Sequence, residues 1–168
     1  NADVDLDLHE GANLISFYAL PDDVSVGNIF DGADGVIGQG VGAVNINGTW
    51  IGSLTGVSQD DGYWVKVSEA TTLSLTDAEP VNYDTDGIVI YGIGYGNNLI
   101  SYSFANEQGL AEGLGENAAD VYAIAGEGLA ALAINGSFVG SLTAFEGSRG
   151  YWLVATADFE FSFNGVDD

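Results

Sequence analysis

The sequence contains no cysteine and no methionine, and Lys66 and Arg149 are its only Lys or Arg residues. Without cysteine, neither a disulfide nor a thiolate metal site can form. Two such cations cannot neutralise a phosphate backbone or an anionic bilayer surface, which excludes nucleic acids as partners. The sequence also lacks an apolar run of the roughly 18 residues that a membrane helix needs, so we expect no membrane insertion.

Acidic and apolar residues are abundant instead. The 168 residues include 25 Asp and Glu, which give a formal net charge of -23, and 46% of the residues are hydrophobic. Such a chain can bury a core and is globular, although its carboxylates repel one another. We therefore expect stabilisation by salt or bound cations, and a saline or calcium-containing environment outside the cell. Because the first residue is Asn1, we also expect a processed piece of a longer secreted product.

The chain contains an internal repeat. Residues 36–67 align with residues 124–155 at an offset of 88, and 13 of the 32 aligned positions are identical. Nearer the start of each copy, GANLISF (11–17) aligns with GNNLISY (96–102) at an offset of 85. Two copies of one unit of about 80 residues explain this pattern. We place the first unit at residues 1–80 and the second at residues 81–168.

The pattern inside each copy is typical of β-strands. VDLDLH (4–9) alternates strictly between apolar and polar residues. NLISFY (13–18) and GYWVKV (62–67) are apolar on both faces, which indicates central strands covered on two sides. The N-terminal strand can pair within its own unit or complete the sheet of a neighbouring chain, and we favour the first arrangement.

Turn and helix signals occur once in each copy. Asn47-Gly48 and Asn135-Gly136 stand between apolar runs and predict two matching two-residue hairpin turns. Apolar spacing predicts one short helix near residues 26–30 and another near residues 110–114. The expected fold is therefore mostly β, with two tandem pseudo-equivalent antiparallel β units that each contain one short helix.

The opening and closing residues of each copy resemble a known module. GANLISF (11–17) followed by GYWVKV (62–67), and their second copies, are similar to a tandem repeat of secreted and surface bacterial, archaeal and marine viral proteins. In that module, G-x-N-L-I-S opens a unit and G-Y-W closes it. The resemblance covers nearly the whole chain and implies an accessory part of a larger extracellular protein, usually with no assigned function. The chain departs from the module at Ala12 and Asn97, where an aromatic residue is common, so any role of that aromatic does not carry over.

A candidate calcium loop lies at the boundary of the two units. NYDTDG (82–87) places the oxygen-bearing side chains of Asn82, Asp84 and Asp86 at positions 1, 3 and 5, with glycine at position 6. Calcium loops use this arrangement, although position 12 is Ile93 here and lacks their carboxylate. The alternative is an acidic turn between the units.

Three tryptophans are candidate ligand-binding residues. Trp64 and Trp152 occupy the same position in the two copies of G-Y-W, and Trp50 follows the first hairpin turn. An exposed tryptophan on a strand can stack on a sugar ring, whereas a packed one belongs to the core. Both interpretations remain open from the sequence.

No catalytic constellation is present in the sequence. His9 is the only histidine, and the aligned position in the second copy is Gly94. The G-x-S-x-G pattern of serine hydrolases is also missing. We therefore expect a non-enzymatic, extracellular structural or adhesive module, a building block of a surface layer, filament or virion appendage. Its expected partners are copies of itself or flanking modules. The alternative is a carbohydrate-binding module that takes a glycan.

Overall fold

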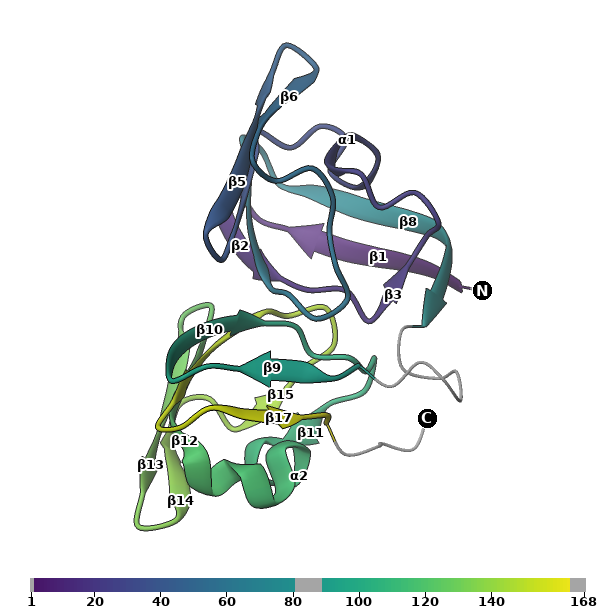
Figure 1. Ribbon diagram of the computed structural model, residues 1–168. Helices are drawn as coiled ribbons and strands as arrows, with labels where there is room; N and C mark the ends of the chain where they lie inside the picture. Colours follow the sequence, from purple (N-terminus) through teal and green to yellow (C-terminus); the bar gives the residue numbers. More distant parts are fainter. Residues whose placement is uncertain (1, 81–88, 164–168) are drawn as a thin grey trace.

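The computed structural model describes residues 2–80 and 89–163 and confirms the predicted fold class (Figure 1). The protein is mostly β, with two antiparallel β units that each contain one short α-helix. We call residues 2–80 the first half and residues 89–163 the second half. The predicted unit boundary near residue 80 adjoins residues outside the described ranges, so its position stays a prediction.

The strands and helices follow one another along the chain in this order. The first half contains β1 (Ala2–Leu8), β2 (Gly11–Ile15), β3 (Ala19–Leu20), α1 (Val26–Ile29), β4 (Gly35–Gly38), β5 (Val41–Ile46), β6 (Thr49–Gly52), β7 (Tyr63–Val67) and β8 (Thr71–Pro80). The second half contains β9 (Tyr91–Ile93), β10 (Gly96–Ile100), β11 (Gln108–Gly109), α2 (Leu110–Leu114), the 3-10 helix η1 (Gly115–Asp120), β12 (Val121–Gly126), β13 (Leu129–Ile134), β14 (Ser137–Gly140), β15 (Ala144–Phe145), β16 (Tyr151–Ala155) and β17 (Phe159–Phe161).

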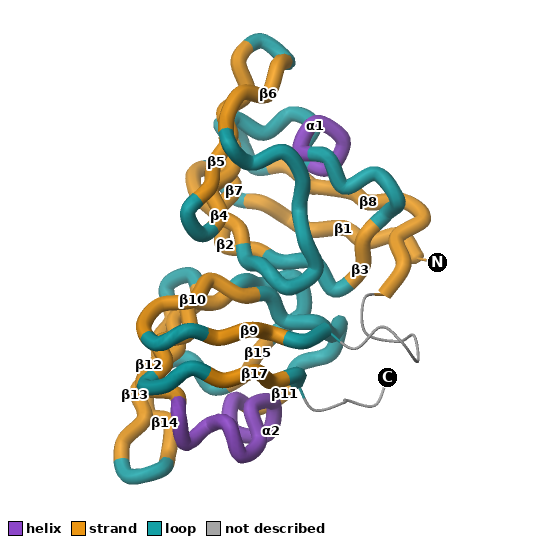
Figure 2. The backbone as a smooth tube through the Cα atoms, in the orientation of Figure 1, coloured by secondary structure: helices purple, strands orange, loops and turns teal. Residues whose placement is uncertain are grey.

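Each half is built around a five-stranded antiparallel sheet. The strand order is β2-β7-β4-β5-β6 in the first half and β10-β16-β12-β13-β14 in the second, so corresponding strands take corresponding places. The two sheets lie along one side of the molecule, at the left in Figure 1. The other strands and the helices lie on the opposite side of these sheets (Figure 2).

A smaller sheet packs behind the five-stranded sheet of each half. In the first half β8 pairs with β1 and with β3, and in the second β9 pairs with β17. In β1, Val4, Leu6 and Leu8 are buried while Asp5 and Asp7 are exposed, as the alternation predicted. The N-terminal strand pairs within its own half, which was the favoured arrangement.

The hydrophobic core consists of two clusters. One cluster contains buried side chains between Val4 and Ala78, and the other contains buried side chains between Val89 and Phe163. Leu20 packs against both clusters. Each half therefore has a core of its own.

The hairpins β5–β6 and β13–β14 have the predicted turns. Asn47 and Gly48 have φ angles of 52° and 90°, and Asn135 and Gly136 have φ angles of 52° and 84°. Two successive positive φ angles are the geometry of a type I′ turn, whose twist matches that of the flanking strands. Asparagine and glycine adopt this conformation at low cost, which explains why these dipeptides stand there.

The two α-helices are short. α1 has four residues and α2 has five, neither has a side-chain hydrogen bond at its N-cap, and each contains an interior glycine, which weakens a helix. Their apolar residues Val26, Ile29, Leu110 and Leu114 are buried, so packing rather than helix propensity holds them. Within the described ranges, no helix has the length and hydropathy to span a bilayer.

The two halves meet at a contact that we call the junction, formed by the ends of β2 and β10 and the loops before β7 and β16. Ile15 forms an isolated β-bridge with Arg149, and Ile100 forms one with Asp61. Leu14 is fully buried but belongs to neither core cluster. β2 is an edge strand of its sheet, not the central strand that its apolar sequence predicted. Its apolar residue Leu14 is covered instead by the second half, where Gly150 lies against it.

Candidate functional site

The most prominent candidate site is the face of each five-stranded sheet that points away from the core. On the first sheet this face carries the exposed side chains Ile37, Val44, Ile46 and Ile51, which we call the first outer face. On the second sheet it carries Leu132, Ile134 and Val139, which we call the second outer face. These residues share a face because they are cross-strand neighbours or lie two positions apart on a strand.

The exposed fraction of these seven side chains is high. It ranges from 45% for Leu132 to 61% for Ile37. The opposite face of the same strands already supplies the core, with Val36 and Ile124 fully buried. The fold therefore does not require apolar residues on the outer faces. Single exposed apolar residues are ordinary, but a contiguous patch marks an interaction surface.

The strands of the two five-stranded sheets carry one charged residue, Lys66 on β7, which lies on the first outer face opposite Gly35. Residues 35–59 contain no Asp, Glu, Lys or Arg, and neither do residues 128–145. By contrast, the exposed side of β1 carries Asp5 and Asp7. Their carboxylates accept hydrogen bonds from Ser74 Oγ at 2.7 Å and Thr72 Oγ1 at 3.0 Å. In a chain with a net charge of -23, these apolar faces, which lack acidic residues, are the part of the surface least suited to water.

Trp64 and Trp152 lie where the outer faces approach the junction. Trp64 is the cross-strand partner of Leu14 and Ile37, and Trp152 takes the corresponding place beside Leu99. Both tryptophans are half-buried, while the two leucines are fully buried. Each tryptophan can thus offer part of its surface to a ligand from a fixed position.

Trp50 lies on the opposite face of its sheet from Ile51. Its ring packs against the first core cluster, with its centroid 6.4 Å from that of Phe30. Phe138 packs against the second core cluster at the aligned position. Trp50 thus contributes packing, whereas the other two predicted tryptophans point outward.

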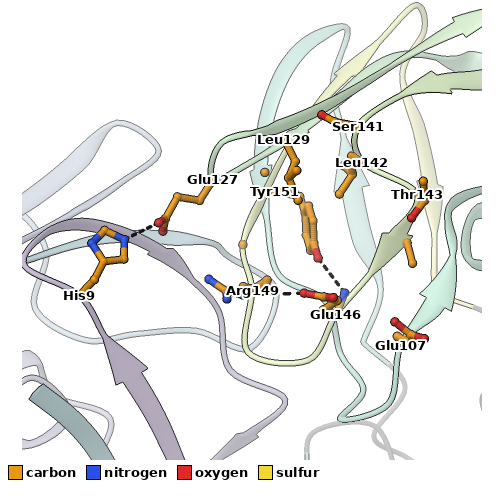
Figure 3. A pocket seen from close by; sticks show the side chains of 13 residues that line it. His9, Glu107, Glu127, Leu129, Ser141, Leu142, Thr143, Glu146, Arg149 and Tyr151 are labelled. Carbon is orange, nitrogen blue, oxygen red and sulfur yellow. Dashed lines mark hydrogen bonds and ion pairs between the residues drawn. The ribbon is translucent and has the colours of Figure 1, made fainter. Parts of the chain in front are cut away.

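A shallow cavity of about 280 Å³ lies beside the junction, lined mainly by the second half (Figure 3). His9 enters it from the first half, and its Nε2 atom bonds to a carboxylate oxygen of Glu127. The other Glu127 oxygen accepts a hydrogen bond from the backbone N–H of Leu14 at 2.8 Å. On another wall, Arg149 and Glu146 form an exposed ion pair at 4.0 Å. Glu127 therefore ties two segments of the first half to the second.

Both ring nitrogens of His9 face oxygen atoms. Nδ1 lies 2.8 Å from the carbonyl oxygen of Glu10, and Nε2 contacts Glu127. Both nitrogens carry a proton only in the imidazolium form, so the Glu10 carbonyl and then the Glu127 carboxylate raise the pKa of His9. This arrangement favours an ion pair at the junction over a general base, which needs a free ring nitrogen.

The predicted calcium ligands Asn82, Asp84 and Asp86 lie outside the described residues, so the calcium loop stays a prediction. Across the ranges 2–80 and 89–163, no three His, Asp or Glu side chains gather into a group that could hold a metal ion.

Sequence reasoning missed the outer faces and Glu127 as functional residues. The outer faces have a signal in the sequence, because 25 consecutive residues (35–59) lack charge in a strongly acidic chain. Glu127 has no such signal, because its partners Leu14 and His9 lie 113 and 118 positions away.

Comparison with known proteins gave no match: no protein-family model, no curated protein and no solved structure matches this chain.

Proposed function

We propose that this protein is a non-enzymatic structural or adhesive module of an extracellular assembly at a cell or virion surface, which packs against copies of itself through its outer faces. The observation that carries this proposal is the pair of exposed aliphatic faces, with Lys66 as the one charged residue in their sheets, on a chain with a net charge of -23. Water is a poor environment for a contiguous aliphatic surface, so covering that surface is favourable.

The size of the outer faces sets the strength of the contact. Complete burial of one aliphatic side chain contributes about 1.5–3 kcal/mol, so seven half-exposed side chains contribute roughly 7 kcal/mol in total. The loss of translational and rotational freedom opposes association by about 4–15 kcal/mol. One contact between two molecules is therefore weak. Stable assembly requires several simultaneous contacts, as in a layer or filament.

The charge distribution determines how two copies approach. Chains with a net charge of -23 repel one another, and salt screens this repulsion. The hairpins β5–β6 and β13–β14 project at opposite ends of the molecule in Figure 1, and their strands are uncharged. Contact through these strands brings the fewest carboxylates together. Association is thus expected to strengthen with both protein and salt concentration.

Sedimentation velocity on the full chain tests this proposal. We expect the average mass of the wild-type protein to rise with protein and NaCl concentration. Val44→Lys combined with Leu132→Lys places a charge at the centre of each outer face and is expected to keep the protein monomeric.

The matched control combines Thr72→Lys with Thr76→Lys, both on the exposed side of β8. It makes the same change of charge as the double variant, away from the outer faces, and should associate like the wild type. Because each lysine lowers the net negative charge, long-range repulsion cannot explain a loss of association. A wild-type chain that stays monomeric under all these conditions would contradict the proposal.

Carbohydrate binding is the second candidate function, favoured by the outward positions of Trp64 and Trp152. Binding on a glycan array that disappears in Trp64→Ala and Trp152→Ala, with the fold intact, would support it. Trp50→Phe is the control, because Phe138 fills the aligned position in the second half.

Calcium binding by Asn82, Asp84 and Asp86 is part of the proposal, since a dication would reduce the repulsion among the carboxylates. A chelator should then lower the melting temperature, and Asp84→Asn should abolish this effect. An unchanged melting temperature in the chelator would remove calcium from the proposal.

A further inference from the structure

The junction between the two halves is reciprocal. Ile15 of the first half bridges to Arg149, and Ile100 of the second half bridges to Asp61. Residues 15 and 100 are aligned at the offset of 85, and residues 61 and 149 are aligned at the offset of 88. The end of β2 therefore contacts the loop before β16, and the end of β10 contacts the corresponding loop before β7. Reciprocity of this kind defines an isologous, two-fold interface.

The backbone hydrogen bonds across the junction follow the same rule. Gly150 N donates to Leu14 O at 3.3 Å, and Gly62 N donates to Leu99 O at 3.3 Å. The next bonds along the strands are also matched: Ser16 N to Ser148 O at 3.1 Å, and Ser101 N to Asp60 O at 3.2 Å. The backbone of either half therefore presents both the donors and the acceptors that the junction uses.

One glutamine or glutamate from each half adds a side-chain hydrogen bond at aligned positions, whereas the hydroxyls of Ser16 and Ser101 donate to the carbonyl oxygens of Arg149 and Gln59, which are not aligned. Gln39 Oε1 accepts the backbone N–H of Leu99 at 2.9 Å, and Glu127 Oε1 accepts that of Leu14 at 2.8 Å. Glutamine and glutamate have similar length, and both offer an oxygen at this position. The exchange of one for the other leaves this hydrogen bond in place.

We infer that the junction is self-complementary, so that either half can pair with the same half of a second copy of this chain, as well as with its own partner half. The surface involved is the junction and not the outer faces, so this inference goes beyond the proposed function and does not depend on it. The partner must present the same backbone donors and acceptors as this chain. These are a strand end such as residues 14–16 and a loop such as residues 60–62.

The differences between the halves set the preferred pairing. Gln39 Nε2 donates to the carbonyl oxygen of Asn97 at 3.1 Å, whereas the carboxylate of Glu127 has no N–H to donate and bonds to His9 instead. The residue aligned with His9 is Gly94. A pair of second halves would bring each Glu127 toward a carbonyl oxygen with no histidine nearby. Pairing of unlike halves is thus favoured, and pairing of two second halves is the least favourable.

The test uses the full chain with Val44→Lys and Leu132→Lys, so that contact through the outer faces does not contribute. A protease site is introduced within residues 81–88, and the folded protein is cleaved there. Light and ¹⁵N-labelled samples are mixed and examined by native mass spectrometry. We expect exchange between light and heavy unlike pairs. Pairs of first halves should be detectable, and pairs of second halves should be at least ~ten-fold rarer than unlike pairs at neutral pH.

The matched variant combines His9→Gly with Glu127→Gln, which gives both halves the same side chains at these positions. The three kinds of pair should then shift toward the statistical ratio of about 1:2:1 that equal affinities produce, with Asp61 and Arg149 as the charge difference that remains at the junction. Unlike pairs alone in both proteins would overturn the inference, and so would halves that separate as folded monomers.

A second measurement applies if cleavage unfolds the protein. The uncut chain is refolded at high concentration, where a self-complementary junction lets halves exchange between chains and gives dimers that survive dilution. Refolding to monomers at every concentration would overturn the inference. Both measurements use the protein with Val44→Lys and Leu132→Lys, in which the outer faces do not associate. A negative result here therefore does not contradict the proposed function. A negative sedimentation result likewise does not contradict this inference.

Discussion

The two halves use the same strand order in their five-stranded sheets and the same backbone hydrogen bonds at the junction, yet they differ in the side chains beside it. Gln39 in the first half corresponds to Glu127 in the second, and His9 corresponds to Gly94. The shared features are backbone bonds, which many sequences can make. The differing features are charges, which distinguish one partner from another. The backbone hydrogen bonds thus form the contact between the halves. The side chains at the aligned positions 39 and 127, and 9 and 94, favour the pairing of unlike halves.

The outer faces of the two halves can be compared in the same way. Val44 is aligned with Leu132, and Ile51 is aligned with Val139, so the identities differ while the apolar character is the same. The exposed fractions are also similar, at 55% and 45% for the first pair and 56% and 55% for the second. The property that the two halves share is hydrophobicity rather than shape, which suits a contact that packs apolar surface without a specific pocket.

The largest expected effect comes from the glycines of the junction. A Cβ atom at Gly62 would lie 2.7 Å from the carbonyl oxygen of Ile100, and one at Gly150 would lie 2.6 Å from that of Ile15. Gly62→Ala and Gly150→Ala should each lower the free energy of unfolding by about 3 kcal/mol, because a backbone clash behaves as overpacking. Urea unfolding measures the change.

Gly92→Ala is the control for these variants, since a Cβ atom there meets nothing within 4 Å. It should stay within about 0.5 kcal/mol of the wild type, as ordinary surface substitutions do. If Gly62→Ala and Gly150→Ala differ by more than about 1 kcal/mol, the junction is not reciprocal in energy, whatever its geometry.

A medium effect is expected at the tyrosines of the two cores. The hydroxyl of Tyr63 accepts the backbone N–H of Ser58 at 2.8 Å, and that of Tyr151 accepts the N–H of Glu146 at 2.7 Å. Tyr63→Phe and Tyr151→Phe should each destabilise the fold by about 1.5 kcal/mol, because a partly buried donor loses its acceptor. If only one of these two variants is destabilised, the two halves are not equivalent at this tyrosine hydrogen bond.

Alkaline unfolding provides a further measurement at the same site. Burial raises the pKa of Tyr151 to about 12, above its ordinary value of 10.0. The stability that this shift contributes is complete below pH 10 and is lost as the pH rises toward 12. Tyr151→Phe should therefore reduce the loss of stability between these pH values.

The smallest effect is expected at His9, which is exposed and therefore screened by solvent. Its pKa is raised above 6.5, so its contribution is complete below that pH and is lost as the pH rises through the higher value in the folded protein. His9→Gly should lower the melting temperature at pH 5.5 but not at pH 9. In a Glu127→Gln background this difference should shrink, and an unchanged difference would show that Glu127 is not the partner that matters.

Local signals in the sequence predicted local structure well. Asn47-Gly48 and Asn135-Gly136 predicted their hairpins, because positive φ at two successive residues is a property of the residues themselves. The alternation in residues 4–8 predicted which side chains of β1 are buried. The sequence was less informative for β2. A strand that is apolar on both faces has the same sequence pattern whether its second face is covered by its own unit or by the other half.

The candidate sites show the same limit. Trp50, Trp64 and Trp152 look alike in the sequence, but the parity of each residue on its strand places Trp50 inside and the other two outside. The partners of Glu127 are more than a hundred positions away, and no spacing rule reaches that far.

The sequence by itself determined that the protein is acidic, mostly β and built twice, because charge, alternation and turn residues act locally and need no knowledge of the partner. Only the tertiary structure decided that the two halves contact one another reciprocally and which apolar residues remain uncovered. Long-range contacts depend on where each chain segment lies in space, and the same apolar residue is core or surface according to what packs on it.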